Sequence, residues 1–318
     1  MIRFDGGIHI GGEMILDPTR RKQRAFVSHA HSDHLRRHET ILATAETIAL
    51  AEPRIGKFQG IVLDPGKTYR LGPCKIRLES AGHILGSSQF IVDFSEKRIV
   101  YTGDFKLGPN PVCPPAEIHE CDILMMDTTF GHPAFKFPDF GEAVGRLIEF
   151  VDGCRHRGAV PIIHAYALGK AQEVIKILND DGIEVFAAAS ICEYAGIYER
   201  YGVKFGSYRL FDGQYPENGV LLLPPGNRIT GDLLPGYAKR NCLVSGWAAS
   251  PRFGFGKYYD QAIPLSDHAS FDDLLLYAEQ SKAETIYCLF GFDEIVDQLK
   301  RRGLNAMKAS LKASTKYS

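Results

Sequence analysis

Three histidines and one aspartate fall within six residues near the start of the chain, in the segment His29-Ala-His31-Ser-Asp33-His34. The segment follows a short apolar run at 25–27, which predicts a strand that ends in a turn. In an extended segment His29 and His31 point to the same side, because side chains alternate with a period of two. Beyond the turn, Asp33 and His34 can reach a neighbouring position. The spacing predicts two adjacent metal sites, one for each pair, with a bridging water between them.

Two single residues further along have the side chains to complete such a site. His83 lies in a glycine-flanked turn just before a predicted strand, and Asp104 follows the predicted strand 99–103. Both side chains therefore emerge at strand ends, where a carboxylate such as that of Asp104 can bridge two cations. Either residue alone is more often a capping or core polar group, but beside the histidine cluster we expect both to be metal ligands.

The arrangement of predicted elements points to an α/β protein. Between residues 6 and 127 the pattern is mostly short apolar runs separated by glycine, proline and aspartate, which predicts strands and turns, with one helix near 46–52. From about residue 140 helical and strand patterns alternate, as in the layers of an α/β fold. The chain therefore divides into a strand-rich first part and an alternating second part, and helix and strand patterns return after residue 270.

The composition is that of a globular protein without a membrane segment. The 318 residues include 37 Lys+Arg and 38 Asp+Glu, a formal net charge of -1, and 45% of them are hydrophobic, which excludes disordered, coiled-coil and collagen classes. No stretch approaches the roughly 18 apolar residues of a membrane helix, and residues 1–12 do not resemble a signal peptide. The seven cysteines form no CxxC pair, which favours reduced thiols over disulfides. We expect a soluble cytoplasmic protein.

The HxHxDH segment, followed by a lone histidine and a lone aspartate at these intervals, resembles the metallo-β-lactamase superfamily of hydrolases. The resemblance implies an αββα sandwich with the metals at one edge of two sheets. It implies two ligand sets that share a bridging carboxylate: His29, His31 and His83 for the first metal, Asp33 and His34 for the second, and Asp104 as the bridge. Zinc is the expected metal, as one or two ions, because imidazoles and carboxylates without thiolate suit it, while manganese and iron stay open.

Further segments resemble the β-CASP nuclease branch of that superfamily. Asp127-Thr128-Thr129-Phe130 resembles its motif A and Ser266-Asp-His268 its motif B, which implies that Asp127 and His268 form a proton donor beside the metals. Asp33 is also counted as catalytic. The alternatives are that Asp127 forms only an Asx turn and that His268 only caps a helix.

Four residues are predicted to bind substrate. Lys170 opens a predicted helix after a glycine, where an ammonium and free backbone N–H groups can hold a phosphate. Ser245 and Trp247 lie in a Ser-Gly-Trp signature of the branch, where the indole can stack on a base. Thr128 follows Asp127. The alternatives are a plain surface lysine at position 170 and a packed aromatic at position 247.

The resemblance covers nearly the whole chain and implies a division into domains. The hydrolase domain is expected at 1–131 and 264–318, and the β-CASP insert at 132–263. Such an insert is expected to cap the metal edge and to leave a cleft that suits a polymeric strand better than a small ester. The basic residues flanking the histidine cluster could then follow phosphates, although a solvated surface is the commoner role of such a run. They are Arg20, Arg21, Lys22, Arg36 and Arg37.

One departure from the branch bears on the substrate. RNA-processing β-CASP enzymes usually carry a histidine, in motif C, after a strand near the C-terminus, where it binds the second metal. In this chain the predicted strand 286–289 leads into Phe290-Gly291, so we expect a weaker or differently completed second site. An aspartate in motif A without the motif C histidine resembles DNA-directed members, including Artemis, Apollo and prokaryotic DNA ligase-associated exonucleases.

The resemblance therefore favours a metal-dependent nuclease that hydrolyses DNA, an exonuclease in DNA repair or processing. DNA is favoured over RNA as partner, and a DNA ligase or helicase partner is suggested by the family alone. Three alternatives remain: an RNA-processing β-CASP ribonuclease, a small-molecule (thio)ester hydrolase, and a nucleic-acid-binding scaffold that does not cut. The scaffold is expected to have lost metal ligands, and all six are present.

Overall fold

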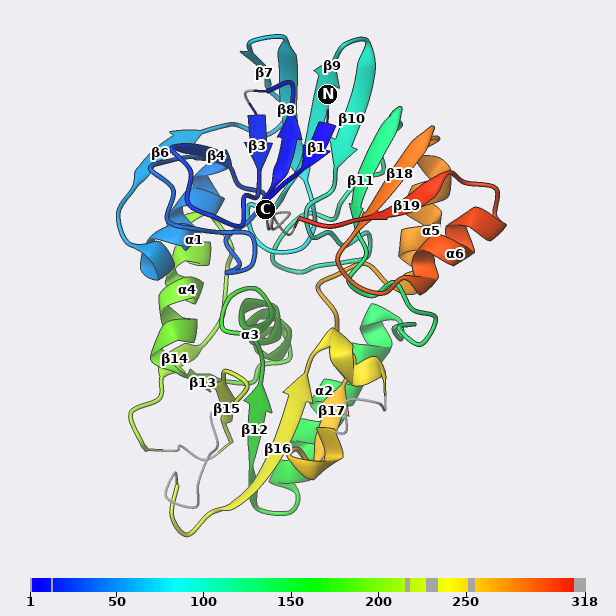
Figure 1. Ribbon diagram of the computed structural model, residues 1–318. Coiled ribbons are helices and arrows are strands. Elements are labelled where there is room, and N and C mark those ends of the chain that lie inside the picture. Colours follow the sequence, from blue (N-terminus) through cyan, green and yellow to red (C-terminus); the bar gives the residue numbers. More distant parts are fainter. Residues whose placement is uncertain (1, 13, 215–217, 227–233, 251–254, 312–318) are drawn as a thin grey trace, which may run out of the picture. The chain divides into compact units, whose positions relative to one another are not determined.

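The computed structural model describes residues 2–12, 14–214, 218–226, 234–250 and 255–311. The chain forms two compact units (Figure 1). Unit 1 consists of Met1–Gly108, Cys113–Pro133 and His268–Ser318, and unit 2 of Pro109–Val112 and Ala134–Asp267. The α/β class predicted from the sequence is confirmed, because helices and several sheets alternate along the chain.

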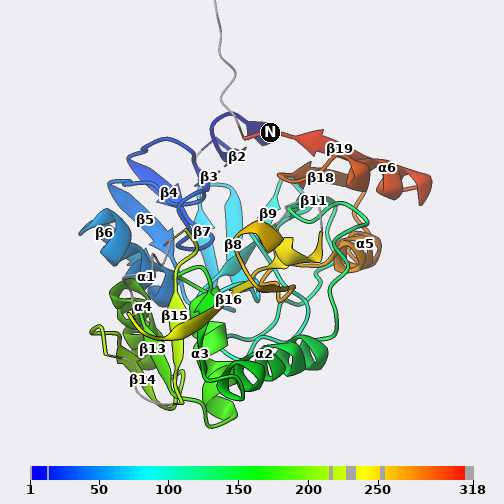
Figure 2. The same ribbon diagram turned by 90° about the horizontal axis from the view of Figure 1, so that it is seen from below.

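The first sheet of unit 1, sheet 1, has six strands that follow one another in chain order (Figure 2). They are β1 Ile2–Phe4, β2 Ile8–Ile10, β3 Met14–Leu16, β4 Arg24–Phe26, β5 Thr40–Ala43 and β6 Gln59–Val62. The first three strands are antiparallel, and β3 to β6 are parallel. Between parallel neighbours the chain must travel back along the sheet. The connections 17–23 and 27–39 therefore both run from the carboxyl ends of the strands to their amino ends.

The second sheet of unit 1, sheet 2, has seven strands in the order β19-β18-β11-β10-β9-β8-β7. They are β7 Thr68–Leu71, β8 Cys74–Ser80, β9 Ser88–Phe94, β10 Lys97–Tyr101, β11 Ile123–Asp127, β18 Thr285–Leu289 and β19 Ala306–Ala309. Strands β7 to β10 form an antiparallel meander, whereas β10, β11, β18 and β19 are parallel. The carboxyl ends of β10, β11 and β18 therefore lie at one edge of the sheet.

The core of unit 1 lies between its two sheets. Alternate residues of β8, β9 and β10 share one buried cluster with residues of sheet 1, among them Leu78, Phe90 and Tyr101 from sheet 2 and Ile8 and Leu16 from sheet 1. This burial follows from the period-two alternation of apolar residues in antiparallel strands. The other face of sheet 2 packs against two helices through a separate cluster.

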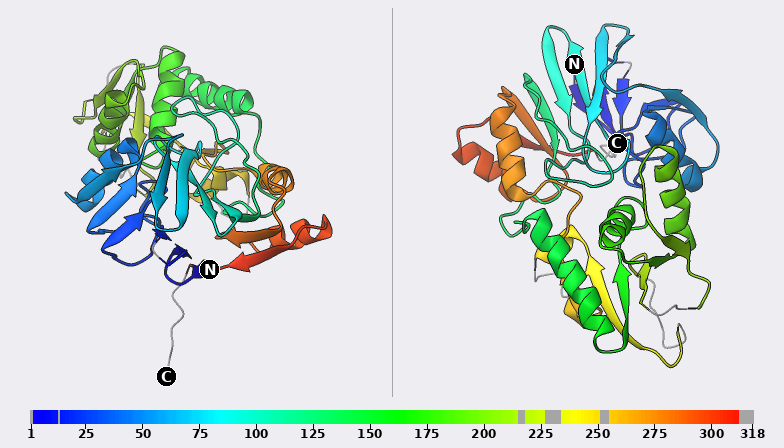
Figure 3. Two further views of the ribbon diagram at one scale, coloured as in Figure 1. Left: turned by 90° about the horizontal axis from the view of Figure 1, so that it is seen from above. Right: turned by 180° about the vertical axis from the view of Figure 1, so that it is seen from behind.

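Three helices belong to unit 1. α5 Phe271–Gln280 and α6 Glu294–Arg301 pack on sheet 2 (Figure 3, right), and α1 Ala45–Ile55 contacts β5 and β6. α5 begins with a capping box in which the Ser270 hydroxyl accepts from the Asp273 N–H at 3.1 Å and the Asp273 carboxylate accepts from the Ser270 N–H at 2.9 Å. This cap fixes the start of the helix at Phe271, three residues after His268.

Unit 2 is built on sheet 3, which has six parallel strands in the order β14-β13-β15-β12-β16-β17. They are β12 Ala159–His164, β13 Val185–Ala187, β14 Tyr208–Leu210, β15 Val220–Leu223, β16 Ala238–Val244 and β17 Gln261–Ile263. α2 Phe140–Arg155, α3 Lys170–Asp180 and α4 Ala189–Arg200 share one buried cluster with this sheet, and η1 Gly246–Ala249 and η3 Phe255–Lys257 are short 3-10 turns. The alternation of helix and strand predicted from residue 140 onward is confirmed.

Within the described ranges, no helix has both the length and the apolar character needed to cross a bilayer.

Candidate metal centre

The histidines and aspartates predicted to bind metal come together at one edge of unit 1, beyond the carboxyl ends of its parallel strands. His29, His31, Asp33 and His34 follow β4, His83 precedes β9, Asp104 follows β10, Asp127 ends β11 and His268 precedes α5. Close approach of the backbone allows this convergence. Gly103 has φ 55°, and a Cβ there would lie 2.9 Å from the Ser28 Cβ, so the chain before Asp104 can approach the segment after β4 only with glycine at this position.

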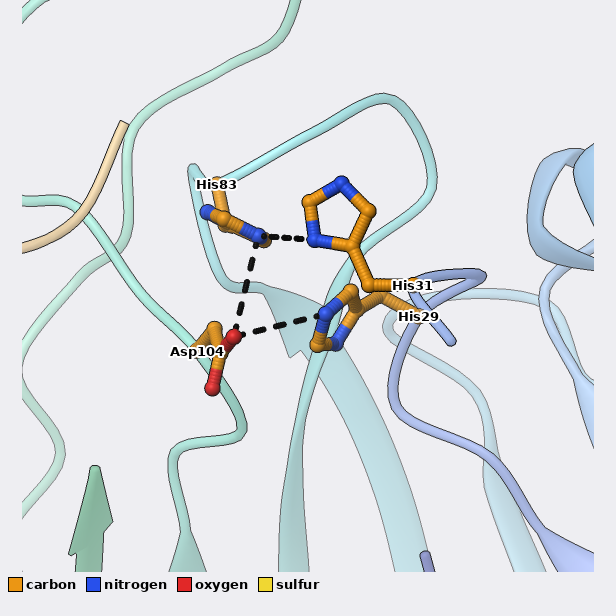
Figure 4. Close-up of side chains that lie close together, drawn as sticks. All are labelled: His29, His31, His83 and Asp104. Atoms are coloured by element: carbon orange, nitrogen blue, oxygen red, sulfur yellow. Dashed lines mark hydrogen bonds and ion pairs between the residues drawn. The ribbon is translucent and has the colours of Figure 1, made fainter. Parts of the chain in front are cut away.

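A first group contains His29, His31, His83 and Asp104, whose ligand atoms all lie within 4.8 Å of one another (Figure 4). Nε2 of His83 lies 2.9 Å from Nδ1 of His31 and 3.8 Å from Oδ2 of Asp104. The same carboxylate oxygen lies 3.4 Å from Nε2 of His29. Three imidazoles and one carboxylate that converge in this way form the donor set expected for zinc, manganese or iron.

The polar groups of this cluster fit a cation better than they fit one another. His29 is fully buried, yet its Nε2 makes no hydrogen bond to any residue that the structure describes. A buried ring nitrogen without a partner is costly. A cation bound between the three histidines would satisfy it, and the residues present therefore fit a metal ion.

A second group contains Asp33, His34 and Asp104, whose ligand atoms also lie within 4.8 Å of one another. Nε2 of His34 lies 3.2 Å from Oδ1 of Asp104 and 3.8 Å from Oδ2 of Asp33. The Asp33 side chain is 71% exposed, whereas His34 is buried. Because the two oxygens of Asp104 face the two groups, this carboxylate is placed to bridge two cations.

Asp17 orients both groups and was missed in the sequence analysis. Its Oδ2 accepts hydrogen bonds from Nδ1 of His34 at 2.8 Å, from the Tyr101 hydroxyl at 2.7 Å and from the Ser28 hydroxyl. The Ser28 oxygen in turn lies 3.0 Å from Nδ1 of His29. With both Nδ1 atoms engaged as donors, the Nε2 atoms of His29 and His34 are left to face Asp104.

A sequence signal for Asp17 exists, although it is weak. The residue directly follows a buried strand and precedes a proline, 12 positions before the cluster, so nothing in its spacing ties it to the histidines. The register of β3 beside β4 brings it there: Leu16 pairs with Phe26, and the Asp17 N–H donates to the Phe26 carbonyl at 2.9 Å.

Burial and charge set the ionisation of the cluster in opposite directions. Burial lowers the pKa of His29 well below its usual value, and the neighbouring His34 adds to this. Burial also opposes the charged form of His34, but the carboxylates of Asp104 and Asp17 outweigh it and raise the pKa of His34 well above its usual value. The histidines around Asp104 overcome its burial and hold its pKa well below the usual range. A neutral His29 beside an ionised Asp104 is the state that a cation requires.

Asp127 and His268 form a separate pair beside Asp104. Nδ1 of His268 lies 3.2 Å from Oδ2 of Asp127, and its Nε2 lies 3.9 Å from Oδ2 of Asp104. The other oxygen of Asp127 accepts from the N–H and the hydroxyl of Thr129, at 2.9 and 2.7 Å. Burial and the nearby Asp104 raise the pKa of Asp127, which His268 opposes. The arrangement directs Nδ1 of the imidazole towards Asp127 and leaves Nε2 towards the cluster.

Phe290 lies beside the second group. Its ring centroid is 5.3 Å from that of His34, and the residue has φ 61°, which is uncommon for a side chain with a Cβ. Thr128 holds this turn, because its hydroxyl lies 2.9 Å from the Leu289 carbonyl and 3.0 Å from the Phe290 carbonyl and can donate to either. At the next residue, Gly291, there is no room for a Cβ, which would lie 1.8 Å from the backbone carbonyl oxygen of Thr128.

The other three predicted substrate-binding residues belong to unit 2. Lys170 begins α3 but is buried, and its ammonium pairs with the buried carboxylate of Glu173. Ser245 is buried and caps η1, accepting from the Trp247 N–H at 3.4 Å. The Trp247 ring lies edge-on to Phe135, with centroids 5.5 Å apart. Each side chain therefore has a contact inside its own unit, and the substrate-binding role of all four residues stays a prediction.

Comparison with known proteins gives relatives along most of the chain. A "Probable DNA ligase" from Opitutus terrae is 35% identical over 297 residues, which is 92% of this chain and 29% of that protein. A "Probable RNase MJ4" from Methanocaldococcus jannaschii is 28% identical over 224 residues, 58% of this chain and 52% of the relative. A "Transcription termination factor FttA" from Thermococcus kodakarensis is 34% identical over 152 residues, 44% of this chain and 24% of the relative. The chain thus spans about half or less of the length of these relatives.

The chain was also compared with protein-family models and with solved structures. No protein-family model matches the chain. A solved structure of a protein of unknown function from Enterococcus faecalis V583 superposes with a TM-score of 0.60 at 15% identity, over 89% of this chain and 78% of that one, which bears on the fold alone.

The relatives, the histidine and aspartate cluster and the Asp127–His268 pair agree with the resemblance found in the sequence. The chain belongs to the β-CASP branch of the metallo-β-lactamase superfamily.

Proposed function

We propose that the protein is a metal-dependent nuclease that hydrolyses phosphodiester bonds of DNA, as an exonuclease in DNA repair or processing. One observation carries the proposal: the Asp104 carboxylate lies within 4 Å of an imidazole nitrogen from each of the two ligand groups and from the Asp127–His268 pair. When bound, divalent cations at such a carboxylate activate water and neutralise the charge that develops on a phosphodiester. We propose zinc as the metal, while manganese and iron also suit this donor set.

The chain's own residues supply the remaining steps. The histidines and Asp104 would hold the cations at the scissile phosphodiester. His268 is placed to donate a proton to the departing 3′-oxygen, because Asp127 engages its Nδ1 and directs its Nε2 towards Asp104. In the absence of His268 the leaving oxygen would depart as a poorly stabilised alkoxide.

The division of labour between the two units is part of the proposal. We propose that residues 1–131 and 264–318 form the αββα hydrolase domain and that 132–263 form the β-CASP insert. The core between sheets 1 and 2, with α5 and α6 on the other face of sheet 2, supports the first assignment. Substrate contacts by Lys170, Ser245 and Trp247 would then come from the insert, and Thr128 would act at the hydrolase edge.

Two observations favour DNA over RNA. Phe290 occupies the position beside His34 where RNA-processing members of the branch are expected to carry a histidine. The relative that matches 92% of this chain is named a probable DNA ligase, which also supports a DNA ligase as functional partner. A helicase partner stays a prediction. None of the seven cysteines, all within the described ranges, forms a disulfide, which suits the reducing cytoplasm as the place of action.

An RNA-processing ribonuclease is the second candidate, because relatives named "RNase J-like protein" and "Probable RNase MJ4" also match the chain. The same cluster would serve either substrate, since the chemistry at the phosphodiester is shared. A small-molecule (thio)ester hydrolase is the third candidate, and it rests on the metal cluster alone.

The test is cleavage of 5′-labelled and 3′-labelled single-stranded DNA and RNA of matched sequence, with zinc or manganese. The intact protein is compared with Asp33→Ala, His268→Ala and the exposed-carboxylate control Asp5→Ala. We expect metal-dependent loss of DNA that Asp33→Ala and His268→Ala abolish or slow and Asp5→Ala leaves unchanged; the label retained gives the direction of digestion. Preferential cleavage of RNA would transfer the proposal to the ribonuclease, and cleavage of neither by metal-loaded protein would refute it.

A further inference from the structure

Basic residues gather on the two connections that flank the metal cluster. Residues 18–39 contain six arginines and lysines but only two acidic residues, Asp33 and Glu39. Arg20, Arg21, Lys22, Arg36 and Arg37 lie on the connections, and Arg24 is the first residue of β4. Since the whole chain has a formal net charge of -1, this excess is local and not a property of the composition.

The two connections lie side by side along sheet 1. Each returns from the carboxyl end of one parallel strand to the amino end of the next, so both leave the edge that carries the metal cluster and run away from it. Hydrogen bonds join them in the same order along both segments. Nε of Arg36 donates to the Thr19 carbonyl at 3.1 Å, the Lys22 N–H donates to Nδ1 of His38 at 3.1 Å, and the Thr40 N–H donates to the Gln23 carbonyl at 2.9 Å.

These contacts hold in place the backbone that carries the exposed basic side chains. Arg36 is only partly exposed, and its guanidinium also donates to the Leu35 carbonyl at 2.8 Å, so this arginine braces the chain just after His34. His38 is buried, with a pKa lowered to about 4 by burial, and the arginine and lysine near it add to this against the pull of Asp17. It is therefore neutral near pH 7 and acts as an uncharged acceptor between the connections.

Most of the remaining basic side chains are available to an anion. Arg20, Arg24 and Arg37 are exposed, and none of the three forms an ion pair within the described ranges. Arg21 pairs with Glu39 at 3.5 Å, but the two side chains are 67% and 55% exposed, so the pair contributes little and a phosphate can displace it. Some other exposed cations of unit 1 do have an acidic partner, as Arg98 has in Asp93 at 3.1 Å.

We propose that these residues form a basic track, comprising Arg20, Arg21, Lys22, Arg24 and Arg37, that binds the phosphodiester backbone of a DNA strand leading to or from the metal edge. The inference rests on the proposed function and adds to it where the strand lies on unit 1. Guanidinium groups suit this role because their planar fork matches phosphate oxygens and stays charged at every relevant pH. Contacts of this kind fix the path of a strand without reading its sequence.

The test measures the salt dependence of DNA binding. The metal-loaded protein is titrated against a fluorescein-labelled single-stranded oligonucleotide with phosphorothioate linkages, which resist cleavage, at several salt concentrations. Arg20→Gln, Arg21→Gln and Arg37→Gln are combined in one variant. A second variant combines Lys300→Gln, Arg301→Gln and Arg302→Gln at the end of α6, and so removes the same charge from another part of unit 1.

For three lost phosphate contacts we expect the slope of log K against log salt to fall by about 2, which means about 100-fold weaker binding near 0.1 M salt. The α6 variant should keep the slope of the unchanged protein. Equal slopes in all three proteins, or equal losses in both variants, would overturn the track.

Hydrolysis of bis(p-nitrophenyl) phosphate separates this inference from the proposed function, because so small a diester cannot reach along the track. We expect the track variant to hydrolyse it at the unchanged rate. If the protein without substitutions cleaves neither this diester nor DNA, the proposed nuclease function is refuted. If the track variant hydrolyses the diester at the same rate and also keeps the same binding slope, only the track is refuted.

Discussion

Asp17 accepts a hydrogen bond from Nδ1 of His34 at 2.8 Å, and through the Ser28 hydroxyl it also sets the orientation of His29. One buried carboxylate outside both ligand groups therefore orients a histidine of each group. Removing it should act on metal affinity before it acts on any chemical step.

We expect Asp17→Asn to weaken metal binding by about 10- to 100-fold, the usual effect of losing a partner that orients a ligating histidine. The amide can no longer accept from three donors on one charged oxygen. Isothermal titration with zinc into the metal-free protein measures the effect, and Asp5→Asn, an exposed change of the same kind, is the control. Equal affinities in the two variants would show that Asp17 does not orient the ligands.

Asp104→Asn and Asp33→Ala should separate the two metal sites. Asp104 faces both groups, whereas Asp33 lies only in the second. We expect Asp104→Asn to lower the affinity of both sites and Asp33→Ala to lose the second cation while the first remains. The measurement is metal content after dialysis at a fixed free concentration, with Asp93→Asn on the outer side of β9 as control. Loss of both cations in Asp33→Ala would contradict the assignment of separate sites.

His268→Asn should slow hydrolysis by about 10²- to 10⁴-fold while the protein keeps its metal, because a proton donor is lost and a ligand is not. The deficit should be smaller for a diester with a good leaving group, such as bis(p-nitrophenyl) phosphate, than for DNA. Comparing the rates for both substrates at equal metal content checks this. An equal deficit for the two substrates would show that His268 does not protonate the leaving group.

Phe290→His should strengthen the second site. The Phe290 ring lies beside His34, and histidine is among the residues that tolerate a positive φ such as the 61° found here. We expect a second cation to bind more tightly in a two-step titration, with Phe290→Leu as the control for loss of the ring. If the two variants bind the second cation alike, the position is not part of that site.

His38 predicts a dependence of stability on pH. Its pKa is about 4 in the folded protein and near 6.5 in the unfolded chain. The unfolded state therefore takes up a proton first as pH falls. The contribution of neutral His38 to the free energy of unfolding is fully present above about pH 6.5 and is lost as the pH approaches 4. As the pH falls through this range, the free energy of unfolding should decrease by up to about 3 kcal/mol less in His38→Gln than in the protein without the substitution. Urea unfolding at pH 7.5, 5.5 and 4.5 measures it, and parallel curves for the two proteins would exclude His38 as the source.

The sequence was most informative where residues close in the chain are also close in space. His29, His31 and His34 could be predicted as one cluster because they share a turn, and the strands and helices around them follow from apolar periodicity. His83 and Asp104 could be predicted as ligands from their positions at strand ends beside the histidine cluster, whereas Asp127 and His268 could be placed only through the resemblance to a family. Asp17 could not be found, because it joins the cluster through strand pairing and carries no motif.

The same distinction explains the substrate-binding predictions. The pattern around Lys170 correctly predicts a helix that begins after a glycine, yet it could not predict that the ammonium would be buried against Glu173. That pairing depends on how the helix packs on sheet 3. The Arg20 to Arg37 region is similar: the charges are visible in the sequence, but their alignment on two parallel connections depends on the order of strands in sheet 1.

The order of strands in sheet 2 also affects how the protein folds during its synthesis. On the ribosome, β11 emerges before the segment Ala134–Asp267 of unit 2, while β18, its neighbour on one side, emerges after that segment. Until then β11 is an open edge on a nascent chain, a place where another chain can pair. His268 also emerges after unit 2, just ahead of β18. The last segment therefore completes the sheet and also brings the His268 imidazole beside Asp127. A nascent chain that ends before residue 268 exposes the edge of β11 and lacks this imidazole.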